Sequence, residues 1–179
     1  KGVGLGLPGH VHFEKGLLVT APSLPNWAGK DVRGEAARLF GVPCLADNDA
    51  NVAALAEFAM GAGRGSQNIA YVTISTGVGC GLVLGGKLFH GTYGAAGELG
   101  HLYVSDSGRI RCGCGRTGCV EAMSSGTGMA NYAKLRIGEG AKSILPGLAG
   151  GAERITAKHI ALAVKAGDPL AAEVVDRAA

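Results

Sequence analysis

Residues 31–61 read DVRGEAARLFGVPCLADNDANVAALAEFAMG and decide the class of fold. Residues 31–40 carry apolar side chains at helical spacing, and Gly41 is a suitable end for a helix. The segment 42–46 predicts a short buried strand, and residues 50–60 are rich in the helix formers Ala, Leu and Glu. Helix, strand, polar turn and helix within about 30 residues indicate an α/β fold.

The segments on the N-terminal side are shorter and richer in glycine. Residues 2–9 alternate glycine with apolar residues, which predicts the end of a buried strand entered without a preceding turn, so we expect the chain to be a fragment that begins inside a fold. Residues 13–19 are predicted to form a hairpin around Lys15 and Gly16. Residues 21–30 contain two prolines and are predicted to be a loop.

Towards the C-terminus, β-branched residues at 69–75 predict a central strand. A glycine-rich turn at 76–81 and a strand at 82–84 are expected next, followed by a hairpin through Gly85 and Gly86 into residues 87–89. Two helices are predicted at 156–166 and 169–179, the second with Asp168 as its N-cap. The polar, glycine-rich residues 61–68 are the best linker by composition.

Composition excludes several classes of protein. Apolar residues make up 47% of the 179, which excludes disorder of the whole chain. The 17 basic and 14 acidic residues give a net charge of +3 without any block of five like charges, so nothing indicates a nucleic-acid partner or a membrane surface. Apolar runs are too short to span a membrane, and the first residues lack a signal-peptide pattern. We therefore expect a cytoplasmic protein.

One histidine and three clustered cysteines form the most specific pattern. An imidazole and three thiolates from His101, Cys112, Cys114 and Cys119 suit a closed tetrahedral zinc site. The glycines between the cysteines let the backbone turn tightly enough to aim the sulfurs at one point. Five cysteines without a secretory signal argue against a disulfide framework. Four protein ligands leave no open position, so a structural zinc ion is expected rather than a catalytic one.

Three further patterns have both a structural and a functional interpretation. Polar residues 47–51 open a helix at a strand end, where a carboxylate can cap the helix or accept a proton from a substrate hydroxyl. The glycine turn at 75–81 can be a plain hairpin or an anion site lined by backbone amides. Glu98 and His101 can form a salt bridge, or grip a sugar hydroxyl if zinc fixes the histidine as a donor.

In combination these motifs resemble the ROK family of sugar kinases and sugar-responsive repressors. The motifs are Asp47-Asn48-Asp49-Ala50-Asn51, the turn from Thr76 to Gly81, Glu98-Leu99-Gly100-His101 and the cysteine cluster through Glu121. The resemblance implies an actin-like ATPase (ribonuclease H-like) fold of two α/β lobes, present here in part. It implies residues 1–52 for the remainder of the first lobe and 53–179 for part of the second, with a zinc loop at 101–119.

The resemblance also implies roles for particular residues. Asp49 matches the catalytic base that takes the proton from a sugar hydroxyl as it attacks the γ-phosphate of ATP, which binds with Mg²⁺. The matching sugar-binding positions are Gly9, Asn48, Asp49, Glu98, His101 and Glu121. The matching phosphate-facing positions are Thr76, Gly77, Gly79 and Gly81, and the matching zinc ligands are His101, Cys112, Cys114 and Cys119.

The expected activity is therefore ATP-dependent phosphorylation of a hexose, with glucose as the first candidate. Members of the family usually open with an Asp-x-Gly-Gly-Thr phosphate loop, which is absent here, so the chain by itself is expected to be incomplete. Exposed sheet edges at a fragment's ends favour pairing with a second copy, and we expect a homodimer. The alternative is a sugar-responsive repressor whose DNA-binding segment lies outside this chain.

Overall fold

The computed structural model describes residues 1–21, 23–105 and 109–179. The chain forms two compact units: unit 1 comprises residues 1–73 and 79–98, and unit 2 comprises residues 74–78 and 99–179. The predicted lobe boundary after residue 52 concerns the two lobes of the family's fold and stays a prediction. No helix in the described ranges is long and apolar enough to cross a membrane.

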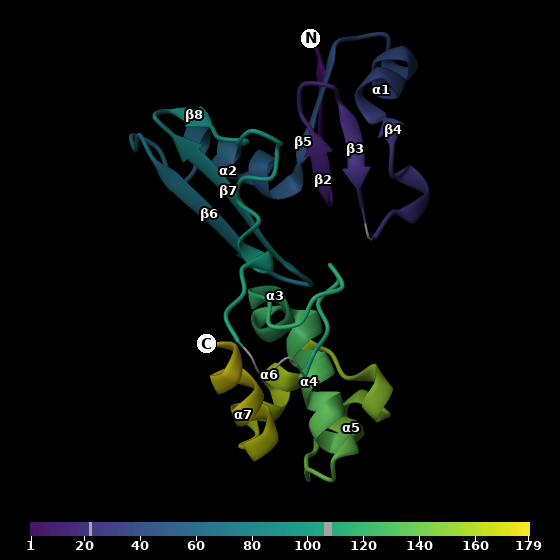
Figure 1. Ribbon diagram of the computed structural model, residues 1–179. Helices are drawn as coiled ribbons and strands as arrows, with labels where there is room; N and C mark the ends of the chain where they lie inside the picture. The colour runs from purple at the N-terminus through teal and green to yellow at the C-terminus, as the bar shows by residue number, and fades with distance from the viewer. Residues whose placement is uncertain (22, 106–108) are drawn as a thin grey trace. The chain divides into compact units, whose positions relative to one another are not determined.

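The described part of unit 1 contains three small sheets (Figure 1). In the first, β1 (Val3–Leu7) runs parallel to β5 (Cys44–Asn48), with Val3 opposite Cys44 and Leu7 opposite Asn48. The second is antiparallel and contains β2 (His10–His12), β3 (Leu17–Thr20) and β4 (Lys30–Asp31). The third has the order β6 (Ile69–Ile74), β7 (Val78–Leu84) and β8 (Lys87–Leu88).

Several N-terminal predictions need correction. The expected buried strand is β1, but its residues alternate between half-buried and exposed. A hairpin is present around Lys15 and Gly16, but its first strand lies at 10–12, before the predicted range of 13–19, and residues 13–16 form the turn. The predicted loop at 21–30 contains the short 3-10 helix η1 (Pro25–Trp27) and the start of β4, and residue 22 lies outside the described residues.

The two predicted helices of unit 1 are confirmed. Helix α1 (Val32–Phe40) is capped by Asp31, whose side chain accepts from Gly34 N, and ends at Gly41 in the left-handed conformation. Helix α2 (Asp49–Met60) follows β5 directly. The strand between them was predicted at 42–46 and lies two residues later. Pairing with β1 draws Asp47 and Asn48 into the strand, because their partners in β1 are Gly6 and Leu7.

The predicted turn at 76–81 is too long. The turn is confined to residues 75–77, where Ser75 N donates to Gly77 O, and β7 begins at Val78. Gly79 and Gly81 therefore lie in a strand that packs closely on α2. A Cβ atom at Gly81 would lie 2.5 Å from Ala50 O and 2.6 Å from Ala54 Cβ. The glycines at these positions serve close approach of a strand to a helix rather than a turn.

The described part of unit 2 is mainly helical. Its helices are α3 (Val120–Ser124), α4 (Gly126–Gly138), α5 (Leu145–Ala149), α6 (Ala157–Lys165) and α7 (Pro169–Ala178), with 3-10 helices η2 (Leu99–His101) and η3 (Ala152–Arg154). Helices α6 and α7 confirm the prediction, whereas α3, α4 and α5 were not predicted. Helix α4 packs against α6 and α7, and α5 packs against α6 (Figure 1).

Both units have a hydrophobic core. That of unit 1 is small and centres on Val11, Leu18, Val32 and Ala46. That of unit 2 includes Ala133, Leu145, Ile160 and Val174 together with Cys112 and Cys119. The cysteines of the metal motif are thus part of the packing of unit 2.

Asp168 is a buried cap at the start of α7. Its carboxylate accepts from Ala171 N and from Ile144 N, both at 2.8 Å. Burial acts to raise the pKa of Asp168, but the hydrogen bonds from these amides outweigh it and hold the pKa below its ordinary value. Asp168 therefore ties α7 to the start of α5.

Candidate functional site

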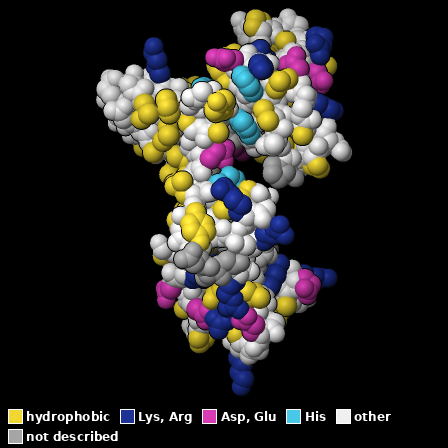
Figure 2. All heavy atoms as spheres, in the orientation of Figure 1, with side chains coloured by type: hydrophobic (Ala, Val, Ile, Leu, Met, Phe, Trp, Pro, Cys, Tyr) yellow, Lys and Arg dark blue, Asp and Glu magenta, His cyan; other side chains and the backbone are white. Residues whose placement is uncertain are grey.

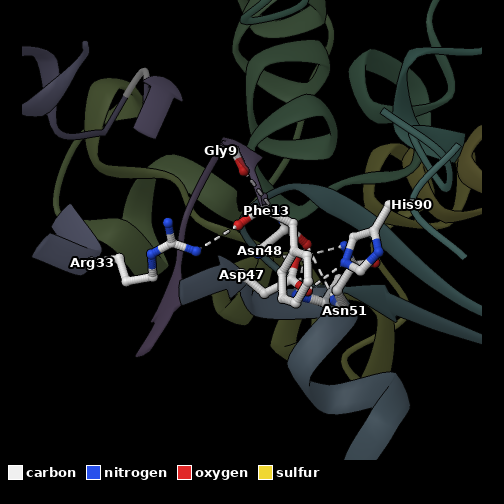
Figure 3. A network of polar contacts seen from close by, with 8 residues as sticks. Gly9, Phe13, Arg33, Asp47, Asn48, Asn51 and His90 are labelled. Carbon is white, nitrogen blue, oxygen red and sulfur yellow. Dashed lines mark hydrogen bonds and ion pairs between the residues drawn. The ribbon is translucent and has the colours of Figure 1, made fainter. Parts of the chain in front are cut away.

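A network of polar contacts surrounds Asp47 at the end of β5 (Figure 3). The Asp47 side chain is buried, and three donors reach its two oxygens. Asn48 N donates to Oδ1 at 2.7 Å and Asn51 Nδ2 donates to the same oxygen at 2.9 Å. His90 Nε2 lies 2.6 Å from Oδ2. A buried carboxylate requires such partners, so Asp47 is a structural anchor rather than a free base.

Asn48 caps helix α2. Its Oδ1 accepts from Ala50 N at 2.9 Å and from Asn51 N at 3.3 Å. Its Nδ2 donates to Gly9 O at 3.0 Å, which brings two predicted sugar-binding residues together. Gly9 has a φ of 100°, and a Cβ there would overlap Thr20 O. The conformation at Gly9 that presents this carbonyl therefore requires glycine.

Asp49 is the first residue of α2 and is exposed. Its Oδ1 accepts from Ala50 N at 2.9 Å. Because Asn48 caps the helix and Asp47 anchors the strand end, the carboxylate of Asp49 is left at the surface for another role. The capping interpretation therefore applies to Asn48, and the proton-accepting role of Asp49 stays a prediction.

His90 and Asn51 belong to this site, and the sequence interpretation missed His90 altogether. His90 follows β8, and its ring stacks on Phe13 with the centroids 4.5 Å apart. Histidine side chains, drawn in cyan, gather on the face of unit 1 shown in Figure 2, and His12 and His90 line the same small hollow. Asn51 Oδ1 is buried and has no hydrogen-bond partner among the described residues. A hydrogen-bond donor placed beside Asn51 Oδ1 could bond to it without breaking an existing hydrogen bond.

The four predicted metal ligands converge in unit 2. The candidate ligand atoms of His101, Cys112, Cys114 and Cys119 all lie within 4.8 Å of one another. His101 Nδ1 is 3.5 Å from Cys112 Sγ, and Cys114 Sγ is 3.8 Å from Cys119 Sγ. Tetrahedral zinc with ordinary bond lengths places nitrogen and sulfur ligands about 3.5 Å apart and two sulfurs about 3.8 Å apart. The donor set and its spacing fit zinc.

The thiols of this cluster differ in acidity. Hydrogen bonds from the backbone and side chain of Arg116 lower the pKa of Cys114 to about 6. Burial raises the pKa of Cys112 to about 12, and burial also raises the pKa of Cys119. Zinc binding requires thiolates, so the metal would displace protons from the two buried sulfurs. Residues 106–108 of the predicted zinc loop lie outside the described residues.

Glu121 connects the metal cluster to the turn at 75–77. Its Oε2 accepts from Val78 N at 3.1 Å, and its Oε1 accepts from Cys112 Sγ at 3.4 Å. A Cβ at Gly77 would lie 2.6 Å from Glu121 Oε2, so the glycine leaves room for the carboxylate. Glu98 is exposed and is the last residue of unit 1.

A pocket of about 550 Å³ lies beside the turn in unit 2. Its walls come from the turn, from α4 and from the start of α6, and include Thr76, Thr127, Lys134, Thr156 and Lys158. Ser75 O and Thr76 O accept from the first amides of α4, which fixes the turn to this wall. Two lysines and several hydroxyls suit an anionic ligand.

Known proteins are similar to this chain over nearly its whole length. The model of the ROK family matches residues 1–179. A glucokinase of Halalkalibacterium halodurans is 38% identical over 178 residues, which are 99% of this chain and 54% of that protein. The chain spans about half the length of the curated glucokinases it matches.

Solved structures show the same relationship. A ROK family glucokinase from Streptomyces griseus, in complex with glucose and AMPPNP, superposes with a TM-score of 0.81 at 36% identity, over 97% of this chain and 56% of that chain. A ROK family transcriptional regulator, a homologue of the E. coli MLC protein, superposes with a TM-score of 0.79 at 32% identity, over 97% of this chain and 42% of that chain.

Proposed function

This chain belongs to the ROK family, and on that premise we propose that its protein transfers the γ-phosphate of ATP to a hydroxyl of a hexose, with glucose as the first candidate. The fold is the mixed α/β, actin-like ATPase fold of ROK sugar kinases over part of their length. The relatives named above include both kinases and a regulator, and the similarity to the glucokinase extends over 99% of this chain.

The observation that carries the proposal is the exposed carboxylate of Asp49. Asp49 is the first residue of α2, which follows the carboxyl end of β5, and β5 is paired in parallel with β1. Ligands of α/β proteins bind at the carboxyl ends of such strands. Neighbouring residues perform the structural work of capping and anchoring. In the proposed reaction Asp49 accepts the proton of the sugar hydroxyl as that oxygen attacks phosphorus. Phosphoryl transfer asks chiefly for such positioning and for charge stabilisation.

Sugar binding is assigned by the match with the family's motif to Gly9, Asn48, Asp49, Glu98, His101 and Glu121. His101 Nδ1 faces Cys112 Sγ within the metal cluster. If Nδ1 held the zinc ion, the proton of the imidazole would reside on Nε2, and His101 would be a fixed donor to a sugar hydroxyl. Zinc would be structural here, held by one imidazole and three thiolates.

ATP with Mg²⁺ is assigned to the turn and the pocket beside it. Thr76 and Gly77 lie in the turn at 75–77, Thr76 lines the pocket, and Lys134 and Lys158 add positive charge to its walls. The phosphate-facing roles of Gly79 and Gly81 stay predictions. The homodimer also stays a prediction.

The test is a coupled assay of the full-length protein against glucose, N-acetylated hexosamines and fructose, with and without ATP. ATP-dependent phosphorylation of one of these hexoses is the expected result. The similarity to a transcriptional regulator makes a sugar-responsive repressor the second candidate. A protein that phosphorylates none of them, but binds DNA in a sugar-dependent way, would replace the first proposal by the second.

A further inference from the structure

We propose that His90 is a positioning residue for the base Asp49 and acts through the buried carboxylate of Asp47. The inference rests on the proposed function, because only that function makes Asp49 a base whose position matters. His90 is not part of the motifs that indicate the family, and it lies 43 residues from Asp47 in the sequence.

The carboxylate of Asp47 is the centre of the network (Figure 3). Its side chain is about 10% exposed, so water replaces a lost partner poorly. One oxygen receives both Asn48 N and Asn51 Nδ2, and the other faces His90 Nε2. His90 therefore stabilises the oxygen that the residues of β5 and α2 do not use.

The ring of His90 is held in place independently of Asp47. It stacks on Phe13 with an angle of 20° between the planes. Three residues later, Tyr93 O lies 2.8 Å from His10 Nε2 of β2. The segment that carries His90 is thus fixed to the β2–β3 hairpin, whose Phe13 O also accepts from Arg33 Nη1 of α1. A donor held this rigidly sets the rotamer of the carboxylate it contacts.

The orientation of the Asp47 carboxylate directly affects the start of α2. Its Oδ1 holds the backbone amide of Asn48 and the side-chain amide of Asn51, which lie on either side of Asp49. Without the donor at Oδ2, the carboxylate would be free to rotate, and both bonds at Oδ1 would weaken. Asp49 would then keep its chemistry but lose its fixed position. Displacement of a reacting group by about 1 Å costs about 100-fold in rate.

The acceptor is a carboxylate, so Nε2 of His90 carries the proton in this contact. Glutamine places an amide nitrogen near the position of Nε2 and can make the same donation. Asparagine is one methylene shorter and cannot reach Oδ2 from the same backbone position. Comparison of His90→Gln with His90→Asn therefore separates the effect of losing the hydrogen-bond donor from the effects of a polar substitution on folding.

The experiment measures kcat and KM of the full-length protein and its variants in the coupled assay, beside the thermal unfolding midpoint. For His90→Asn, kcat is expected to fall about 10- to 100-fold, with a smaller rise in the KM for sugar because Asn48 and Asp49 are also proposed to bind it, and His90→Gln is expected to recover kcat to within about 3-fold of wild type. His12→Asn is the matched control, because His12 lines the same hollow of about 100 Å³ as His90. It should leave both constants unchanged.

A second variant covers the case in which His90→Asn does not fold. Phe13→Leu retains the donor but removes the ring stacking, and it should lower kcat about 3- to 10-fold with a smaller rise in KM. Equal kcat in all variants, equal losses in His90→Gln and His90→Asn, or a loss in KM alone would each overturn the inference. A wild-type protein inactive on every hexose would instead overturn the proposed function, and with it the role of Asp49 that the inference needs.

Discussion

The substitution Asp49→Asn separates catalysis from folding with little ambiguity. Asp49 is exposed, and its Oδ1 accepts a hydrogen bond from Ala50 N, which the Oδ1 of an asparagine can also do. Asn48 keeps both of its capping bonds. What is lost in the folded state is one negative charge at a helix N-terminus, which contributes about 0.3–1 kcal/mol. The thermal midpoint should therefore fall by only a few degrees.

The effect on the reaction should be far larger. A positioned general base contributes about 10²- to 10⁴-fold in rate, which is about 2.7–5.4 kcal/mol of activation free energy. The coupled assay should show kcat reduced by this factor, while calorimetry shows that the sugar still binds. Asp31→Asn is the control, since Asp31 is likewise an exposed carboxylate at a helix N-terminus of unit 1. An Asp49→Asn protein with near-normal kcat would refute the assignment of the base.

Three further predictions concern the metal, the packing of α2 and the pH dependence of stability. Protein purified without chelator should contain about one zinc per chain by elemental analysis, and its removal should lower the unfolding midpoint by more than about 5 °C; protein without zinc would contradict the site. Gly81→Ala should cost about 1–3 kcal/mol in urea unfolding because its Cβ meets Ala50 O, whereas Gly4→Ala, with nothing within 4 Å, should change stability by less than about 0.5 kcal/mol. Asp168→Ala should cost about 1–2 kcal/mol at pH 7. The folded-state pKa of Asp168 is lowered, so the stability difference between wild type and Asp168→Ala is present above the unfolded pKa of about 3.9. The difference should shrink as the pH falls below that value. A stability difference that stays constant down to pH 2 would contradict the role of the charged carboxylate.

The elements that could be predicted from local sequence are those with capping residues at their ends. Helix α1 begins at a capping aspartate and ends at a left-handed glycine, and α7 begins at Asp168 followed by proline. The metal cluster was predicted for a similar reason, since three of its four ligands lie within eight residues of one another and need only a tight loop to meet.

Elements that depend on distant partners were missed or misplaced. Helix α4 begins with Gly126 and Gly128, which are poor helix formers, and its start is fixed instead by Ser125 and by bonds to the turn. The glycines of β7 predicted a turn because nothing local shows that a helix packs against them. His90 has no motif and no spacing that points to Asp47, so only the folded chain brings them together.

The division of the chain between its units has a consequence for the order of folding during synthesis. Unit 1 is made of two stretches separated by residues 74–78, which belong to unit 2. Ser75 and Thr76 find their backbone partners at Gly126 and Thr127, and Val78 finds its partner at Glu121. The contacts described within unit 1 need residues only up to 98, but the contacts of residues 74–78 with unit 2 need nearly thirty more, because their partners at 121–127 are synthesised later. A stall or cleavage in that interval would leave residues 74–78 without the partners that they have at 121–127.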